Sequence, residues 1–169
     1  MKGNQIIVSS DPTGKFKEGI VSGTPKPGTI MSLQTTALSS GRPTWAAFNP
    51  GTGDASKGMM AILLEDTEQG KGWDDAYVSG TRCRLYVPEE GEEVNLRKAD
   101  ITGTGSPTEA IAIAAKLLVV DGTGKISPVA VGVLTTGVQS YPFQAMEAIV
   151  NASAPQLSEE LIWCVYVGT

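Results

Sequence analysis

Residues 63–87 read LLEDTEQGKGWDDAYVSGTRCRLYV, and this stretch predicts a strand, a long polar loop and a second strand. Within the loop, the glycines at positions 70 and 72 flank Lys71. Because glycine reaches backbone angles that other residues avoid, this spacing predicts a tightly shaped loop. From Cys83 to Val87 apolar and polar residues alternate, which is typical of a half-buried strand, and a proline follows. A loop of this length usually contacts a partner.

Short strands are expected on both sides of this stretch. The sequence predicts them at residues 16–21, 30–36, 44–48, 59–64, 83–87, 92–98, 116–120, 129–135, 145–150 and 161–167. Segment 92–98 alternates apolar with charged side chains, so we expect it to be half-exposed. Segment 161–167 is apolar on both faces, which predicts a strand that is either central in a sheet or covered by another chain.

Local rules conflict at residues 106–109, Ser-Pro-Thr-Glu, which resemble the capping box of a helix. Helix propensity extends this prediction over residues 108–118. The Asp-Gly pair at 121–122, in contrast, is a good hairpin turn, and the rest of the chain predicts strands. We therefore expect a strand at 116–120, with at most one helical turn before it.

Taken together, the pattern predicts an all-β fold. We expect a single compact Greek-key barrel or sandwich of short strands with an extended N-terminal arm. Residues 1–22 would form the arm and first strands, and residues 23–169 the barrel or sandwich domain. The 169 residues fit one domain, and 41% hydrophobic content is enough for a core. No window of 18 apolar residues and no secretory leader is present, so we expect neither a membrane span nor export.

The side chains that usually carry catalysis are scarce. The chain has no histidine, and its two cysteines, Cys83 and Cys164, lie far apart in sequence. We expect both to be buried small apolar residues, although a disulfide stays open without geometry. Two cysteines cannot supply a zinc site, and the net charge of −5 argues against a nucleic-acid partner. We predict no enzyme activity, no cofactor and no metal.

Two clusters of acidic residues are expected to have structural roles. The acidic residues of the loop would act as caps and as ion-pair partners of nearby basic residues, and a cation site is the less favoured alternative. They are Glu65, Asp66, Glu68, Asp74 and Asp75. The second group is expected to be a solvated turn and comprises Glu89, Glu90, Glu92 and Glu93.

Three ordered motifs resemble the phage head decoration proteins, also called capsid cement proteins. The first is LED-x-x-QGKG-x-DDAY at residues 64–77, followed by Gly-Glu-Glu-Val at 91–94, although Gly80-Thr81 stands where that family commonly has Gly-Asp. The others are GIVSGTPKPG at 19–28 and VDGTGK at 120–125. The resemblance runs from about residue 16 to the end of the sequence given, with long weakly similar parts between the motifs.

The resemblance implies a virion structural protein without catalytic residues. Such a protein binds the outer surface of the assembled capsid and cements neighbouring major capsid protein subunits. It would be assembled in the host cytoplasm, contact neither nucleic acid nor membrane, and associate as a trimer or dimer. The apolar segment 161–167 is the expected basis of self-association.

Three segments are the candidates for partner contact, namely the arm, the proline-rich connector at 23–28 and the loop at 65–75. The candidate residues are Asn4, Gln5, Ile6, Ile7, Val8, Pro25, Lys26, Pro27, Glu68, Gln69, Lys71, Trp73 and Asp74. The alternatives are that the arm is an ordinary first strand and that the connector is a rigid turn within the domain. If the arm carries binding, deletion of residues 1–10 should leave the domain folded and abolish capsid binding.

The alternative function is a receptor- or carbohydrate-binding β-domain displayed on the virion surface. It would need an exposed aromatic platform, for which Trp45, Trp73 and Tyr77 are the candidates. We expect core packing to be the role of at least two of them.

Overall fold

Ten strands form two sheets in the computed structural model, which describes residues 5–39, 41–48, 59–98, 114, 116–119, 124–128, 143–147 and 161–168. The prediction of an all-β fold is confirmed, because the described residues hold no α-helix and only one short 3₁₀ helix, η3 (Thr67–Gln69). The strands are β1 (Lys15–Val21), β2 (Ile30–Ser39), β3 (Arg42–Ala47), β4 (Met60–Leu63), β5 (Arg82–Val87), β6 (Glu93–Arg97), β7 (Lys116–Val119), β8 (Ile126–Pro128), β9 (Phe143–Ala145) and β10 (Leu161–Tyr166).

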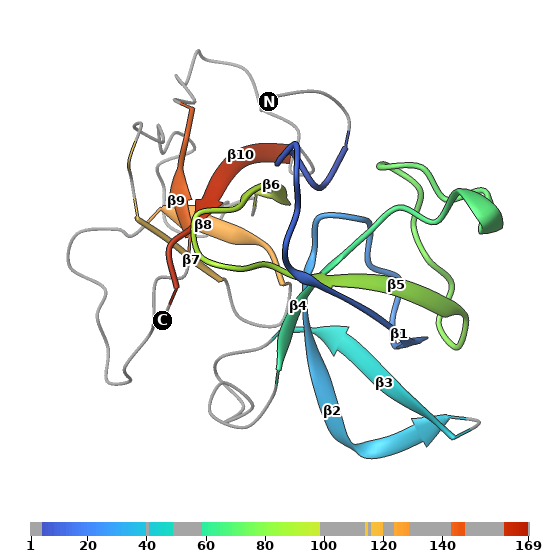
Figure 1. The fold of residues 1–169 in the computed structure, drawn as a ribbon. Coiled ribbons are helices and arrows are strands. Elements are labelled where there is room, and N and C mark those ends of the chain that lie inside the picture. The colour runs from blue at the N-terminus through green and yellow to red at the C-terminus, as the bar shows by residue number, and fades with distance from the viewer. Residues whose placement is uncertain are drawn as a thin grey trace, which may run out of the picture.

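Strands β1 to β5 close into a barrel in the order β1-β3-β2-β4-β5 (Figure 1). β1 pairs with β5 antiparallel along most of its length and with β3 in parallel at its end. The connections from β1 to β2 and from β3 to β4 therefore each pass a neighbouring strand. Inward-facing side chains fill the barrel, and they are Val21, Met31, Trp45, Ala61, Leu63, Tyr77, Cys83 and Leu85.

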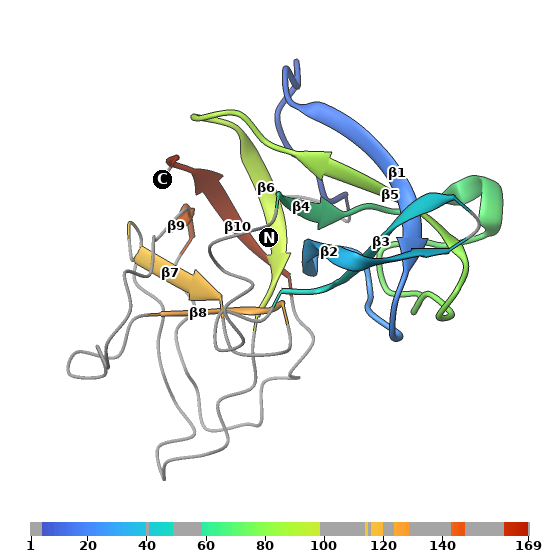
Figure 2. The same ribbon diagram turned by 90° about the horizontal axis from the view of Figure 1, so that it is seen from below.

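The other five strands form a second sheet in the order β6-β10-β9-β7-β8, in which every strand pair is antiparallel (Figure 2). β10 lies between β6 and β9, which confirms the central position as one of the two alternatives for segment 161–167. Both edges of the strand are thus paired within the chain, whereas Trp163, Val165 and Tyr166 stay half-buried. Self-association through this strand therefore stays a prediction. A bridge between Lys98, just after β6, and Ile126 of β8 brings the far edge of this sheet back toward its first strand.

The space between the barrel and the second sheet holds a second apolar cluster. It includes Ile30, Ile62 and Tyr86 from the barrel and Leu96, Leu117 and Ile162 from the second sheet. Cys164 belongs to this cluster, whereas Cys83 lies inside the barrel, and both are free thiols. The expectation that the cysteines are buried apolar residues is confirmed, and they do not meet.

Two predictions about individual segments need correction, and others fall outside the described residues. β6 is not half-exposed, because Asn95 and Arg97 are buried by segments far away in sequence. For residues 145–150, where we predict a strand in preference to a turn of helix, the structure shows only the end of β9 at Ala145 and a bend at 146–147, and residues 148–150 lie outside the described residues. The predicted strand at 116–120 is confirmed as Lys116–Val119. The strand predicted at 129–135, and all but a few residues of the possible helix at 108–118, lie outside the described residues.

Candidate partner-binding surface

The three segments predicted to contact a partner meet one another beside β6. The connector binds the residues that flank the loop on both sides: the Gly28 amide donates to the Leu63 carbonyl of β4 over 2.8 Å, and the Tyr77 amide donates to the Pro25 carbonyl over 2.9 Å. The N-terminal segment joins the loop as well, since the Ile6 amide donates to the Glu65 carboxylate over 2.8 Å. Segments separated by 20 to 60 positions in the chain thus lie in contact with one another.

The buried side chain of Arg97 in β6 contacts both the connector and the loop. Its side chain is only 1% exposed, and its Nε donates to the Pro27 carbonyl over 2.9 Å. Another guanidinium nitrogen donates to the Trp73 carbonyl, and the guanidinium lies 5.4 Å from the centre of the Trp73 ring. Nη1 also forms an ion pair of 3.2 Å with Asp74. A buried guanidinium that reaches two segments fixes their relative position, because its planar donors have set directions.

The loop has its own internal framework, as the Gln-Gly-Lys-Gly motif predicts. The Asp66 and Lys71 backbones exchange hydrogen bonds of 2.9 and 2.8 Å, and Gly70 turns the chain at a φ of 66°. The buried Asp66 carboxylate accepts a hydrogen bond of 2.5 Å from the Gln69 side chain. Tyr77 closes the loop, because its hydroxyl donates to the Leu64 carbonyl over 2.9 Å. Burial raises the pKa of Tyr77, and the Asp66 charge raises it further, so the hydroxyl stays protonated.

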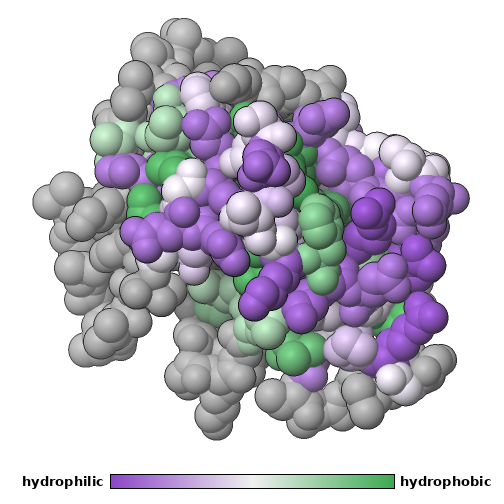
Figure 3. Space-filling model, viewed as in Figure 1, coloured by the Kyte–Doolittle hydropathy of each residue, from purple (hydrophilic) through white to green (hydrophobic). Residues whose placement is uncertain are grey.

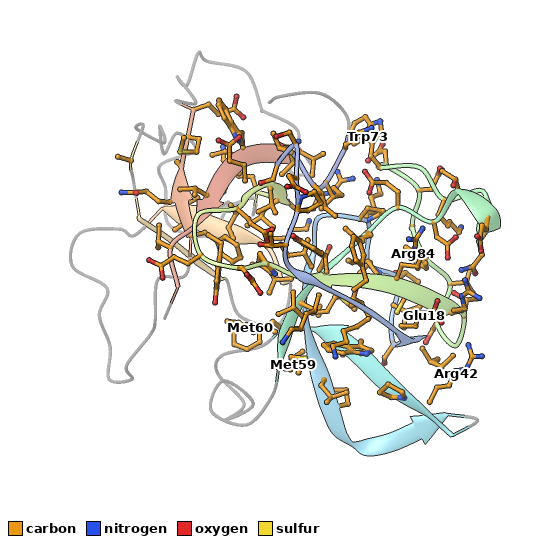
Figure 4. All side chains as sticks on the ribbon, in the orientation of Figure 1. Glu18, Arg42, Met59, Met60, Trp73 and Arg84 are labelled. Atoms are coloured by element: carbon orange, nitrogen blue, oxygen red, sulfur yellow. The ribbon has the colours of Figure 1, made fainter. Side chains whose placement is uncertain are left out.

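The outward side of the connector and loop forms a mixed surface that we call the connector–loop face. It consists of Pro25, Lys26, Glu68, Gln69, Lys71, Trp73, Asp74 and Val78. Its charges are arranged in pairs: Lys26 lies 3.3 Å from Asp74, and Arg82 lies 3.2 Å from Glu68. Figure 4 shows Trp73 projecting from the loop between β4 and β5. Val78 is 59% exposed and adds an apolar contact at the end of the loop.

The N-terminal segment, residues 5–9, lies along the outer edge of β6 and pairs with it at one isolated bridge. Ile7 faces Val94 in an antiparallel bridge, the Val8 amide donates to the Glu93 carbonyl, and the Asn95 amide donates to the Ile6 carbonyl. The segment thus packs against its own domain, but it pairs with β6 at an isolated bridge and not as the ordinary first strand of the alternative. The side chain of Ile6 is fully buried, so in this conformation it contacts the core and not a partner.

The other candidate residues divide by exposure. Gln5 is exposed, whereas Ile7 and Val8 are half-buried, and Asn4 lies outside the described residues. Within the connector, Pro27 is buried, and its carbonyl accepts a hydrogen bond from Arg97. The structure therefore brings the connector and loop residues together at the surface, with Pro27 as the exception.

Glu92 was expected in a solvated turn, and this expectation is wrong. Its side chain is 7% exposed and accepts hydrogen bonds from the amides of Thr13, Gly14 and Glu89 and from the Tyr86 hydroxyl. Burial by itself would raise the pKa of Glu92, but these hydrogen bonds to the charged form outweigh burial and lower it. Glu92 thus anchors the start of β1 to the turn between β5 and β6.

Two of the three aromatic candidates for a carbohydrate-binding platform lie in the barrel core. Trp45 and Tyr77 are 2% and 1% exposed in the barrel core, which confirms core packing for two of the three candidates. Trp73 is half-buried against Arg97. On the face of the molecule drawn in Figure 3, the described residues show apolar and polar side chains interspersed. A hollow of about 30 Å³ between β4, β5, β9 and β10 is far smaller than the roughly 300 Å³ of a typical ligand pocket.

Other kinds of site find no support in the part of the chain that the structure describes. Those residues contain no cluster of acidic or cysteine side chains suited to a metal ion, and no helix that could cross a membrane. Sequence reasoning missed two residues of this surface, the buried Arg97 that supports it and the exposed Val78 that lies on it. Only Val78 had a usable signal, as an apolar residue just before a Ser-Gly turn.

No protein-family model matches the chain, and a search of curated proteins finds none that is similar to it.

Proposed function

We propose that the protein is a phage capsid decoration protein, which binds the outer surface of the assembled capsid and cements neighbouring major capsid protein subunits. One observation carries the proposal: two of the motifs that resemble this family, at residues 19–28 and 64–77, form a single surface although they are far apart in sequence.

The rigidity of the connector–loop face suits this role. Arg97 and the internal hydrogen bonds of the loop hold its backbone before any partner arrives. A preorganised surface loses little conformational entropy on binding, so more of the contact energy appears as affinity. A modest contact repeated over a lattice then stabilises the shell collectively.

The charge pattern of the face favours a protein partner over nucleic acid. Acidic residues 68 and 74 lie beside Lys26, Lys71 and Arg82, so both signs alternate over a short distance. A nucleic-acid surface instead needs a positive patch. The partner we propose is the major capsid protein, at the virion exterior.

The test is to mix the purified protein with undecorated, expanded capsids of the phage that encodes it and to pellet the capsids. We expect the protein to co-sediment and to saturate at a fixed ratio to the major capsid protein. Capsids that already carry their decoration protein provide the control, because their sites are occupied and should take up little more. Absence of co-sedimentation with undecorated capsids would refute the proposal.

A further inference from the structure

The edge of β6 is a groove that accepts one extended segment and one apolar side chain. The backbone of the segment is bound at both ends: the Val8 amide donates to the Glu93 carbonyl over 2.9 Å, and the Asn95 side-chain amide donates to the Gln5 carbonyl over 2.6 Å. The Ser9 hydroxyl accepts a hydrogen bond of 2.8 Å from the Glu93 amide. This is the pattern of strand addition, in which main-chain hydrogen bonds provide affinity and a pocket selects a side chain.

The pocket of this groove is shaped around Ile6. Gly28 forms its floor, since a Cβ at that position would lie 3.2 Å from Ile6 Cδ1 and 2.7 Å from Leu161 Cδ2. The φ of Gly28 is 86°, which also favours glycine. The Glu65 carboxylate completes the site, because it accepts a hydrogen bond from the Ile6 amide. The groove therefore recognises the N-terminal segment by both its backbone and its one buried side chain.

A short exposed hinge separates this segment from the barrel. Residues 10–12 are exposed, and Pro12 restricts the residue before it to extended angles. Directly after the hinge, the amides of Thr13 and Gly14 are anchored on Glu92 over 2.5 and 3.0 Å. The chain is thus fixed on both sides of a hinge of three residues.

We propose that the N-terminal segment exchanges between copies of this protein, so that residues 5–9 of one copy bind the β6 groove of a second copy. The same contacts form within one chain or between two, so the exchange needs only a change in the hinge. A short hinge favours such exchange, and two segments can swap reciprocally in a closed dimer. The proposal goes beyond capsid binding, because it concerns contacts between copies.

Two single-cysteine additions test the exchange. Ile7 and Val94 face each other with hydrogen bonds on either side of the pair, an arrangement in which opposite Cα atoms lie about 4.5 Å apart. That spacing suits a disulfide. Ile7→Cys and Val94→Cys proteins are prepared separately, mixed at high concentration, oxidised mildly and examined on a non-reducing gel and by peptide mass spectrometry. The natural Cys83 and Cys164 are buried, and the parent protein, treated in the same way, is the control for them.

We expect the mixture to give a covalent dimer that contains a disulfide between positions 7 and 94. No single chain carries both new thiols, so this disulfide requires exchange, and its yield should rise with protein concentration. The double variant should close the same disulfide within one chain and shows that both positions tolerate cysteine. If Val94→Cys does not fold, Val8→Cys and Glu93→Cys form a second pair on half-buried positions. Closure in the double variant with no dimer in the mixture would overturn the proposal. The assay contains no capsids, so this result would leave the proposed function untouched.

Discussion

Arg97 and Asp74 form an ion pair of 3.2 Å in which the arginine is almost fully buried while the carboxylate is half-exposed. The buried member comes from β6, and the exposed member lies on the loop that we assign to partner contact. The pair therefore links Asp74 of the connector–loop face to β6 of the second sheet. Its asymmetry predicts unequal effects when either side chain is replaced.

Replacement of Arg97 by methionine should lower the free energy of unfolding by about 3 kcal/mol, because the buried carbonyl of Pro27 and the partly buried carbonyl of Trp73 lose their donor. Asp74→Asn should cost only about 1 kcal/mol, since solvent screens its half-exposed carboxylate. Urea unfolding followed by tryptophan fluorescence measures both. Asp11→Asn, at an exposed position, is the matched control. Equal stability of the parent and the Arg97→Met protein would contradict the organising role of Arg97.

Glu92→Gln should destabilise the protein by about 2 kcal/mol at pH 7, because hydrogen bonds to a charged acceptor are lost. The pKa of Glu92 is lowered in the folded state, so its contribution is complete above the unfolded pKa of about 4.3 and disappears as the pH falls through the folded value. The stability difference between parent and variant should therefore shrink below about pH 4. Urea unfolding at pH 7, 5 and 3.5 measures it. Glu90→Gln, on the same turn but exposed, should show little difference at any of these pH values.

Ile6→Ala should lower stability by about 2–4 kcal/mol, because it leaves a cavity beside Gly28 and Leu161. It should also expose the edge of β6, so that the amides of Glu93 and Asn95, which donate to Ser9 and Ile6, exchange their hydrogens faster. Hydrogen exchange followed by mass spectrometry locates the change. For the same reason, deletion of residues 1–10 should destabilise the domain and not leave it intact. Unchanged protection of β6 in Ile6→Ala would show that the N-terminal segment does not cover this edge.

Val78→Asp should weaken capsid binding by about tenfold or more without changing stability, because the exposed valine lies on the connector–loop face. Val167→Asp is the matched control: it makes the same change at an exposed valine directly after β10, and Figures 1 and 2 show the end of β10 on the opposite side of the molecule from η3 of the loop. Co-sedimentation with undecorated capsids over a range of protein concentrations compares the two. Equal loss of binding in both variants would exclude this face as the specific contact.

Local pattern was enough to predict most of the strands and the shape of the central loop. Alternation from Cys83 to Val87 marks β5, and the glycines around Lys71 mark a tight turn whose backbone bonds form within six residues. Such features depend on neighbours in the chain, which the sequence displays directly. The same local rules failed at β6, where alternation suggested a half-exposed strand.

Tertiary structure alone decided which polar and apolar side chains are buried at the candidate surface. Arg97 meets Pro27 across 70 positions, Glu92 meets Thr13 across 79, and Ile6 meets Glu65 across 59. A buried charge is stable only where partners from elsewhere in the chain satisfy it, and no local pattern specifies those partners. The residues themselves determined an all-β chain with a shaped loop, whereas the closure of the barrel against the second sheet determined which of its side chains a partner can reach.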